Sequence, residues 1–441
     1  MERLADHPYW ELRFDDSGRL TAPDREVFLT EVKGLTDLVV ISHGWNNSDV
    51  EARDLYESLV HGLAARGGPT LGFVGVYWPS LWLPDPPARA PAAGGNAHSL
   101  AEPPPPAARD DRSGAELAEL LRPSFTDPSQ RATIDRLGTL IDQGIAAAAD
   151  AAEAQRARLT EFHHLLATLV PTAGVAIEDS GETALLFADD PELSYPQLAQ
   201  VFGVSGRAGD AEGIGGNFRT VWNGAKEGLR VFSYYTMKSR AGTVGQRGLG
   251  PLLQTLHHRS PGISVHLVGH SFGARLVSCA LAGIGSQQAS PVASLVLLQG
   301  AFSHFAFARA QDNPFAEPGG LNEVADRVHG PLVATFSEHD WAVGRWYPRA
   351  SFLAKQDAFG VDAPLRRWGA MGFDGFQAVA PVSDRDLLPA GRAYRFQPGR
   401  FYRVDGSAVI KDVTQSAFSG AHSDIRGPEV AWLLAAAAGL G

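Results

Sequence analysis

The stretch "SVHLVGHSFGARLVSCALAG" (264–283) decides the fold of this 441-residue chain. Its first part is a short apolar run typical of a buried strand, and its last part has the length and composition of a helix. Between them lies "GHSFG" (269–273), which fits the pattern G-x-S-x-G. In a chain with 48 glycines this pattern alone is a weak sign of a nucleophilic serine, so the prediction depends on the strand before it and the helix after it.

This context makes Ser271 a candidate nucleophile. A sharp turn from strand to helix strains the serine backbone and presents Oγ at the carboxyl edge of the sheet, near the positive end of the helix. Side chains two positions before and after the serine would collide with the helix and the strand, which explains Gly269 and Gly273. The alternative is a tight turn that packs helix on strand, which requires small residues but no serine.

A strand–helix–strand unit near the N-terminus predicts a parallel sheet. "DLVVISHGW" (37–45) is an apolar, β-branched run, and "TLGFVGVYWPS" (70–80) is a second. The segment between them (48–66) predicts a helix, because Ser48 and Glu51 have the spacing of a capping box. A βαβ unit of this kind places helices on the faces of the sheet.

The same alternation resumes in the second half of the chain, so we predict an α/β fold with a doubly wound, mostly parallel sheet of five or six apolar strands. The further strands are expected at 264–271, 293–302, 330–340 and 399–406. Helices are expected at 218–240, 245–259, 274–285 and 427–438.

The middle of the chain departs from this rhythm. Residues 84–113 are rich in proline and alanine, which predicts a flexible excursion, and 131–170 has the periodicity of one or two helices. We therefore expect a first core segment at 1–83, a mainly helical insertion at 84–215 and a second core segment at 216–441 that carries the catalytic residues.

A nucleophilic serine needs a base and an acidic residue that orients the base, in the chain order Ser, then Asp or Glu, then His. Asp340 ends the strand "PLVATFSEHD", and His422 lies in the loop "FSGAHSDIRG" before the final helix. Both positions fit a site at the carboxyl edge of the sheet. The alternatives are His304 and His339 for the base, and Asp326, Glu338 and Asp374 for the acid.

A serine nucleophile also needs hydrogen-bond donors for the oxyanion. The backbone N–H of Phe272 is expected to supply one, and "SHGWNNS" (42–48) is the candidate loop for the second. Gly44 allows a close backbone approach there, and the amide of Trp45 would point at the oxyanion. The alternative is an ordinary strand-to-helix turn capped by Asn or Ser.

Taken together, these motifs resemble the α/β-hydrolase superfamily, and in particular a poorly characterised bacterial branch of serine hydrolases with a His-Gly-Trp-Asn opening. The resemblance covers about 35–83 and 218–438 and implies the triad Ser271, Asp340 and His422, with the amides of Phe272 and Trp45 as oxyanion donors. Residues 84–215 lie outside the family core and would form a lid or cap. The motifs are "ISHGWNNS", "GVYWPS", "VGHSFGARL", "FSEHD" and "GAHSDI".

Composition narrows the function. The formal net charge of −11 argues against nucleic acid as a partner, and the single cysteine, Cys279, excludes an intramolecular disulfide and thiol metal sites. No spacing indicates a metal or a nucleotide, so no cofactor is expected. The N-terminus lacks a signal peptide and no apolar run is long enough for a transmembrane segment, so the expected location is cytoplasmic, although specialised export stays open.

We therefore expect an esterase-like or lipase-like serine hydrolase whose substrate is a small-molecule acyl ester, such as a lipid. Two other functions stay open from the sequence. An acyltransferase or an amidase would use the same triad, and a non-catalytic hydrolase-like scaffold would bind a protein partner through the insertion.

Overall fold

The computed structural model describes most of both core segments and the helices between them. The segment predicted to be a flexible excursion, 84–113, lies outside the described residues except for its last two. Among the described helices, none is both long enough and apolar enough to cross a membrane. The described residues are 2–80, 112–125, 127–147, 152–169, 192, 195–196, 214–285, 288–316, 318–346, 369–414 and 419–440.

The described residues form a ten-stranded sheet with the order β1-β2-β5-β4-β6-β7-β8-β10-β9, in which β3 pairs with β2. The pairs β1–β2 and β2–β3 are antiparallel, and every other pair is parallel. The strands are β1 (Glu2–Leu4), β2 (His7–Phe14), β3 (Leu20–Ala22), β4 (Asp37–Ser42), β5 (Leu71–Tyr77), β6 (Ser264–His270), β7 (Val292–Leu298), β8 (Leu332–Phe336), β9 (Val382–Asp386) and β10 (Phe401–Asp405).

The mostly parallel α/β sheet predicted from the sequence is confirmed, and its central strands are buried on both faces. In β4, Val39 and Val40 point to opposite faces and each is 1% exposed. The outer strands β1, β2, β3 and β9 were not predicted. β9 reads "VSDRD" and is largely exposed, so it lacks the apolar run by which the inner strands are recognised.

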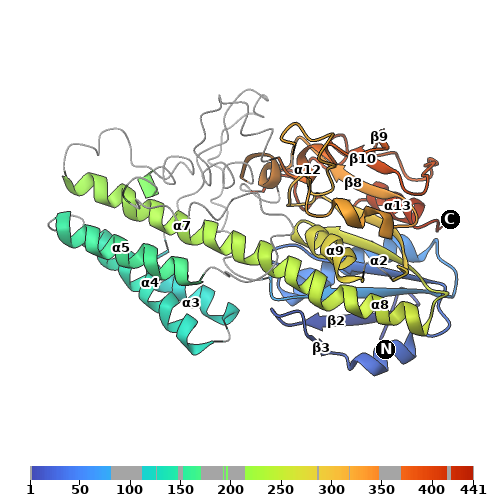
Figure 1. Cartoon of the computed structure of the whole chain (residues 1–441), viewed down its shortest axis with the longest axis horizontal. Helices are drawn as coiled ribbons and strands as arrows, with labels where there is room; N and C mark the ends of the chain where they lie inside the picture. The colour runs from blue at the N-terminus through green and yellow to red at the C-terminus, as the bar shows by residue number, and fades with distance from the viewer. Residues whose placement is uncertain are drawn as a thin grey trace.

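Helices cover both faces of the sheet. α2 (Asp49–Ala64) and α13 (Pro428–Ala437) pack on one face and share a core with Val39. α9 (Phe272–Gly283) packs on the other face, where Val40 contributes to the core (Figure 1). α1 (Arg25–Glu31) also packs there through Phe28.

The chain crosses from β4 through α2 to β5 on one side, and from β6 through α9 to β7 on the other. Because the chain leaves the neighbouring strands β4 and β6 toward opposite edges of the sheet, the topological switch point lies between these two strands. Ligands of open α/β sheets bind outside the carboxyl ends of the strands at such a point. The loops that follow Ser42 and His270 therefore flank the place where a site is expected.

The two helices predicted at 218–240 and 245–259 form one continuous helix. α7 (Ile214–Thr243) passes through a π-helical turn, η3 (Val244–Leu249), into α8 (Gly250–Arg259). A Cβ at Gly245 would lie 2.1 Å from the carbonyl oxygen of Leu276 in α9. The glycine therefore lets this helix approach the backbone of α9 closely.

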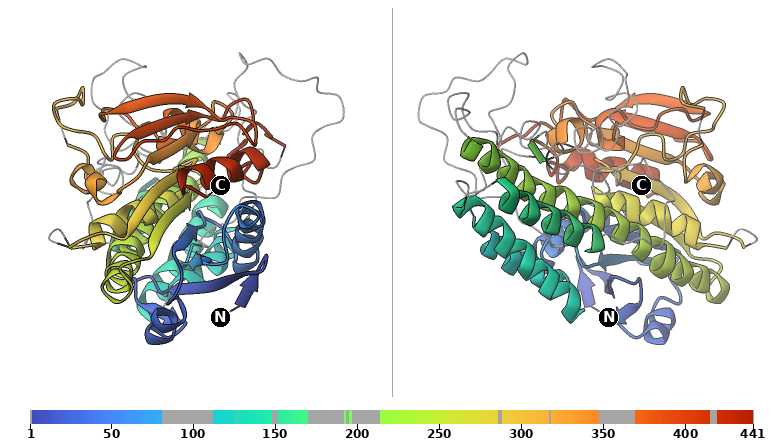
Figure 2. Two further views of the ribbon diagram at one scale, coloured as in Figure 1. Left: turned by 90° about the vertical axis from the view of Figure 1, so that its right-hand side faces the viewer. Right: turned by 60° about the vertical axis from the view of Figure 1, so that its left-hand side comes forward.

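Three further helices lie beside the half of α7 that extends away from the sheet (Figures 1 and 2). They are α3 (Gly114–Leu121), α4 (Pro128–Ala146) and α5 (Ala152–Leu169), so the periodic segment 131–170 contributes two helices. α4 and α5 pack on α7, and α3 packs on α4. Trp222 of α7 is fully buried and contacts Phe162 edge to face, with ring centroids 5.8 Å apart. Gly144 lies against the same indole, where a Cβ would come within 1.9 Å of the ring.

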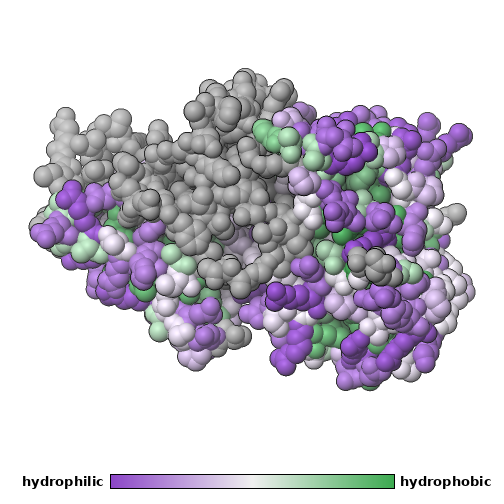
Figure 3. Space-filling model, in the orientation of Figure 1, coloured by the Kyte–Doolittle hydropathy of each residue, from purple (hydrophilic) through white to green (hydrophobic). Residues whose placement is uncertain are grey.

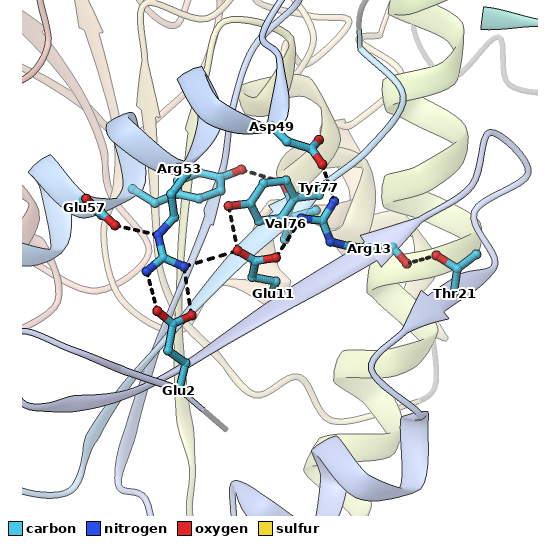
Figure 4. Close-up of polar contacts among 10 residues, drawn as sticks. Glu2, Glu11, Arg13, Thr21, Asp49, Arg53, Glu57, Val76 and Tyr77 are labelled. Carbon is cyan, nitrogen blue, oxygen red and sulfur yellow. Dashed lines mark hydrogen bonds and ion pairs between the residues drawn. The ribbon is translucent and has the colours of Figure 1, made fainter. Parts of the chain in front are cut away.

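A charged network fastens the N-terminal hairpin to α2 (Figure 4). Arg53 of α2 forms ion pairs with Glu2 at 2.6 Å and with Glu11 at 3.2 Å. Arg13 joins Glu11, at 2.7 Å, to Asp49, the first residue of α2, at 2.6 Å. Single surface ion pairs contribute little, but a linked set fixes the position of β1 and β2 relative to α2.

The surface in Figure 3 is predominantly hydrophilic over the described part of the α/β body. Among the residues that the structure describes, the large hydrophobic side chains that stay exposed lie on separate helices. Val27, Val50, Leu120 and Phe373 are 48%, 70%, 37% and 42% exposed, on α1, α2, α3 and α12 (Met371–Asp374), respectively. Exposed apolar residues that are scattered singly in this way are normal for a protein surface.

The contact between α3 and α4 generates a testable prediction. A Cβ at Gly114 would lie 2.1 Å from the carbonyl oxygen of Gly138, a backbone atom that moves only with its helix. We expect Gly114→Ala to force the helices apart and to lower the free energy of unfolding by about 1–3 kcal/mol, measured by chemical denaturation. The control is Gly68→Ala, because a Cβ there meets nothing within 4 Å. Equal stability of the two variants would contradict this account of the packing.

Candidate active site

Ser271 lies in the turn between β6 and α9, where it is the N-cap residue of the helix. Its backbone has φ 57° and ψ −123°, a conformation that a residue with a Cβ rarely adopts and that costs about 1–3 kcal/mol. Two hydrogen bonds hold it: the N–H of Ser271 donates to Leu298 O at 3.1 Å, and the N–H of Ala301 donates to Ser271 O at 3.2 Å. The end of β7 thus supports the strained turn.

The two glycines of the G-x-S-x-G pattern lie at close backbone contacts. A Cβ at Gly269 would be 2.4 Å from the carbonyl oxygen of Gly273, at the start of α9. A Cβ at Gly273 would be 2.3 Å from the carbonyl oxygen of Ser42, at the end of β4. The turn therefore fits between helix and neighbouring strand only because both positions lack a side chain.

The loop after β4 lies directly against Ser271. A Cβ at Gly44 would come within 2.6 Å of Ser271 Cβ and 3.1 Å of its Oγ. The ring of Trp45 packs on that of Phe272, with centroids 6.1 Å apart. The structure thus brings both proposed oxyanion residues next to Ser271. The N–H of Phe272 belongs to the first turn of α9, where N–H groups have no acceptor within the helix.

The turn after β5 holds this loop in place. The indole N–H of Trp78 donates to His43 O at 3.1 Å, and the two rings are stacked, with centroids 5.6 Å apart and planes at 10°. The N–H of Asn46 donates to Ser80 O at 3.0 Å, and Ser80 Oγ donates to Asn47 O at 2.9 Å. We call Trp78–Ser80 the clasp, because its hydrogen bonds reach both sides of Gly44.

His43 is buried behind the loop as a neutral imidazole. Its backbone N–H donates to the hydroxyl of Tyr56 at 2.9 Å, and its Nδ1 donates to the carbonyl oxygen of Gly44 at 2.9 Å. Burial lowers the pKa of His43 to about 4. The side chain therefore supports the loop without carrying a charge.

Asp340 and His422 form a buried acid–base pair. His422 Nδ1 lies 2.7 Å from Asp340 Oδ2, and the Asp340 side chain is completely buried. A carboxylate oxygen only accepts, so Nδ1 carries the proton that it donates to this hydrogen bond, and Nε2 is the ring nitrogen that can act as a base. The N–H of Val343 donates to the other carboxylate oxygen, Oδ1, at 3.2 Å.

The loop that carries His422 is hydrogen-bonded to the turn that carries Asp340. The N–H of Ala421 donates to His339 O at 2.9 Å, next to a backbone bridge between Asp340 and Gly420. Gly420 has φ 59°, and a Cβ there would lie 2.5 Å from His339 O. This contact brings residues that are 82 positions apart in the chain side by side.

His270, the residue before Ser271, connects the turn to His422. Its Nε2 donates to the carbonyl oxygen of His422 at 3.0 Å, and the two rings lie 4.9 Å apart. Burial, followed by the charge of His422, lowers the pKa of His270 to about 3. Among the described residues, no hydrogen bond joins Ser271 Oγ to His422 itself. In enzymes without substrate this bond is often long or poorly aligned.

The alternative acids and bases from the sequence occupy other places. His304 and Asp374 bind each other, with Nδ1 2.8 Å from Oδ1. Glu338 is exposed, its side chain by 63%, and is 3.7 Å from His339 Nε2. Asp326 is exposed in a short 3₁₀-helix, η4 (Asn322–Arg327).

Sequence reasoning missed Gln299, which donates to Asp340 Oδ2 at 2.9 Å. It directly follows β7, as Asp340 follows β8 after a short turn. The rule that selected Asp340, a polar residue at the carboxyl end of an apolar strand, therefore also applies to Gln299. An amide has no acid–base chemistry, so a search for a catalytic acid or base does not find it.

Comparisons with family models, with curated proteins and with solved structures found no match for this chain.

The buried histidines predict a pH dependence of stability. Unfolded histidines bind protons as the pH falls below about 6.5, whereas buried His43 and His270 stay neutral until about pH 4 and 3. The free energy of unfolding should therefore fall as the pH is lowered from 7 to 5, by about 2 kcal/mol for each of them. We expect urea denaturation to show a smaller fall for His270→Asn than for the wild type.

The control is His61→Asn, because the side chain of His61 is exposed on the surface of α2. A fall between pH 7 and 5 that is the same in His270→Asn and in the wild type would contradict the buried, neutral state of His270.

Proposed function

We propose that the protein is a serine hydrolase of the α/β-hydrolase type that cleaves a carboxylic ester of a lipid or another small acyl compound. The observation that carries the proposal is the buried pair of Asp340 and His422, 2.7 Å apart, beside a serine with a strained backbone. The strand order supports it, because Ser271 and the Gly44 loop flank the switch point of the sheet.

In this proposal Ser271 Oγ attacks the ester carbonyl while Nε2 of His422 accepts its proton, and Asp340 stabilises the imidazolium. The amides of Phe272 and Trp45 donate to the oxyanion. The bond to the alcohol then breaks, and His422 returns the proton to that alcohol. Water, deprotonated by His422, attacks the acyl-enzyme. The bond to Ser271 Oγ then breaks, His422 returns the proton to Oγ, and the carboxylic acid is released.

Labelling with a fluorophosphonate tests the nucleophile. We expect the wild type to react at one serine and Ser271→Ala not to react, as judged by the intact mass of the protein. His422→Gln should slow the labelling by at least about 100-fold, because general-base assistance is lost.

The matched control is Ser278→Ala, which removes a buried serine of α9 whose hydroxyl donates to Ala274 O at 2.8 Å. It should be labelled at the wild-type rate. Wild-type protein that reacts no faster than Ser271→Ala would refute the proposed function.

The clasp gives a second prediction about activity. Trp78→Phe keeps a ring against His43 but removes the N–H that donates to His43 O. We expect kcat for a chromogenic ester to fall about tenfold with little change in KM, because the loop after β4, which carries Trp45, is less firmly held. Trp432→Phe is the control: this indole donates to Arg392 O at 2.6 Å, far along the chain from the loop. Equal kcat values for the two variants would exclude this role of Trp78.

A further inference from the structure

We propose that Gln299 is a positioning residue that fixes the carboxylate of Asp340 toward His422. The proposal rests on the proposed function and adds a fourth side chain to the three that the sequence motifs indicate. Gln299 and Asp340 are both fully buried, so each polar atom of the two side chains needs a partner within the protein.

The geometry places the Gln299 amide at the oxygen that His422 uses. Nε2 of Gln299 donates to Asp340 Oδ2 at 2.9 Å, and the same oxygen accepts from His422 Nδ1 at 2.7 Å. Nε2 also donates to the carbonyl oxygen of Gly372 at 3.2 Å. Both protons of the amide are therefore used, and one of them defines the position of Oδ2.

Thr335 of β8 determines which end of the amide faces Asp340. Its hydroxyl oxygen accepts the backbone N–H of Gln299 at 3.1 Å and donates its own proton to Gln299 Oε1 at 2.9 Å. The carbonyl end of the amide is thus held by Thr335, and the NH₂ end is directed at the carboxylate. An amide turned the other way would bring Oε1 against Oδ2, two acceptors without a proton between them.

The backbone of Gln299 supports a specialised role. Its φ is 47°, in the left-handed region that is uncommon for residues other than glycine, asparagine and aspartate. Such a conformation persists only where the surroundings enforce it, and it is concentrated at functional sites. Here it allows both the N–H and the side chain of one residue to reach Thr335.

Gln299→Met tests the proposal, because methionine has a similar length and lacks the donor. The proton of His422 Nδ1 should give a downfield NMR resonance in the wild type that exchanges slowly with solvent; His422→Gln assigns it. In Gln299→Met we expect this resonance to move upfield and exchange faster, and kcat to fall about tenfold at nearly constant KM.

Thr335→Val should also shift the His422 resonance upfield and lower kcat, but by less than Gln299→Met does, because the amide keeps its hydrogen bond to Gly372. This second variant removes a hydroxyl from a strand and does not alter Gln299 itself, so it tests the proposal even where Gln299→Met fails to fold.

The matched control is Ser294→Ala, which removes another buried polar group from β7, one that is hydrogen-bonded to His266 at 2.9 Å. It should leave the resonance and kcat unchanged. An unchanged resonance in a folded Gln299→Met protein overturns the proposal, and so does an unchanged kcat. The resonance requires no turnover, so a protein without Ser271-dependent hydrolysis would refute the proposed function and still test the role of Gln299.

Discussion

The carboxylate of Asp340 is the constraint on which the arrangement of the candidate site depends. Its side chain has no exposed surface, and an ionised carboxylate in such a place costs several kcal/mol unless donors surround it. The donors are the imidazole of His422, the amide of Gln299 and the N–H of Val343. They come from the loop before α13, from the end of β7 and from the turn that follows Asp340. Satisfying one buried group therefore requires three separate segments to assemble at the carboxyl edge of the sheet.

A second constraint is the close backbone approach around Ser271. Gly273 leaves room for the end of β4, and Gly44 brings the β4 loop against Ser271. Backbone contacts this close leave no room for water or for a side chain, so residues on the other side of the loop have to hold it in this position. The Trp78–Ser80 clasp does so through hydrogen bonds to the backbone of the loop. Glycines thus permit the approach, and the indole of Trp78 and the hydroxyl of Ser80 hold the loop through hydrogen bonds.

Much of this arrangement could be predicted because it follows from local patterns. The inner strands are short apolar runs, and a polar residue after such a run lies at the carboxyl edge of the sheet, which is how Asp340 was selected. The role of Gln299 could not be predicted, because it depends on contacts with Thr335 and Asp340, 36 and 41 positions away. Likewise, the sequence indicated His304 as an alternative base and Asp374 as an alternative acid, and only the folded structure shows that the two side chains bind each other. The local sequence pattern predicts which residues lie at the carboxyl edge of the sheet. Which side chain each of them binds depends on tertiary packing.

The chemistry of Gln299 also explains why an amide suits this position. A base of the proposed kind depends on the negative charge of the carboxylate, which stabilises the imidazolium as the proton is transferred. An arginine or a lysine in place of Gln299 would bind Asp340 more strongly, but it would neutralise that charge and compete with His422 for Oδ2. A neutral N–H donor holds the oxygen and leaves the charge in place. The amide therefore provides orientation while the electrostatic effect of Asp340 remains available to His422.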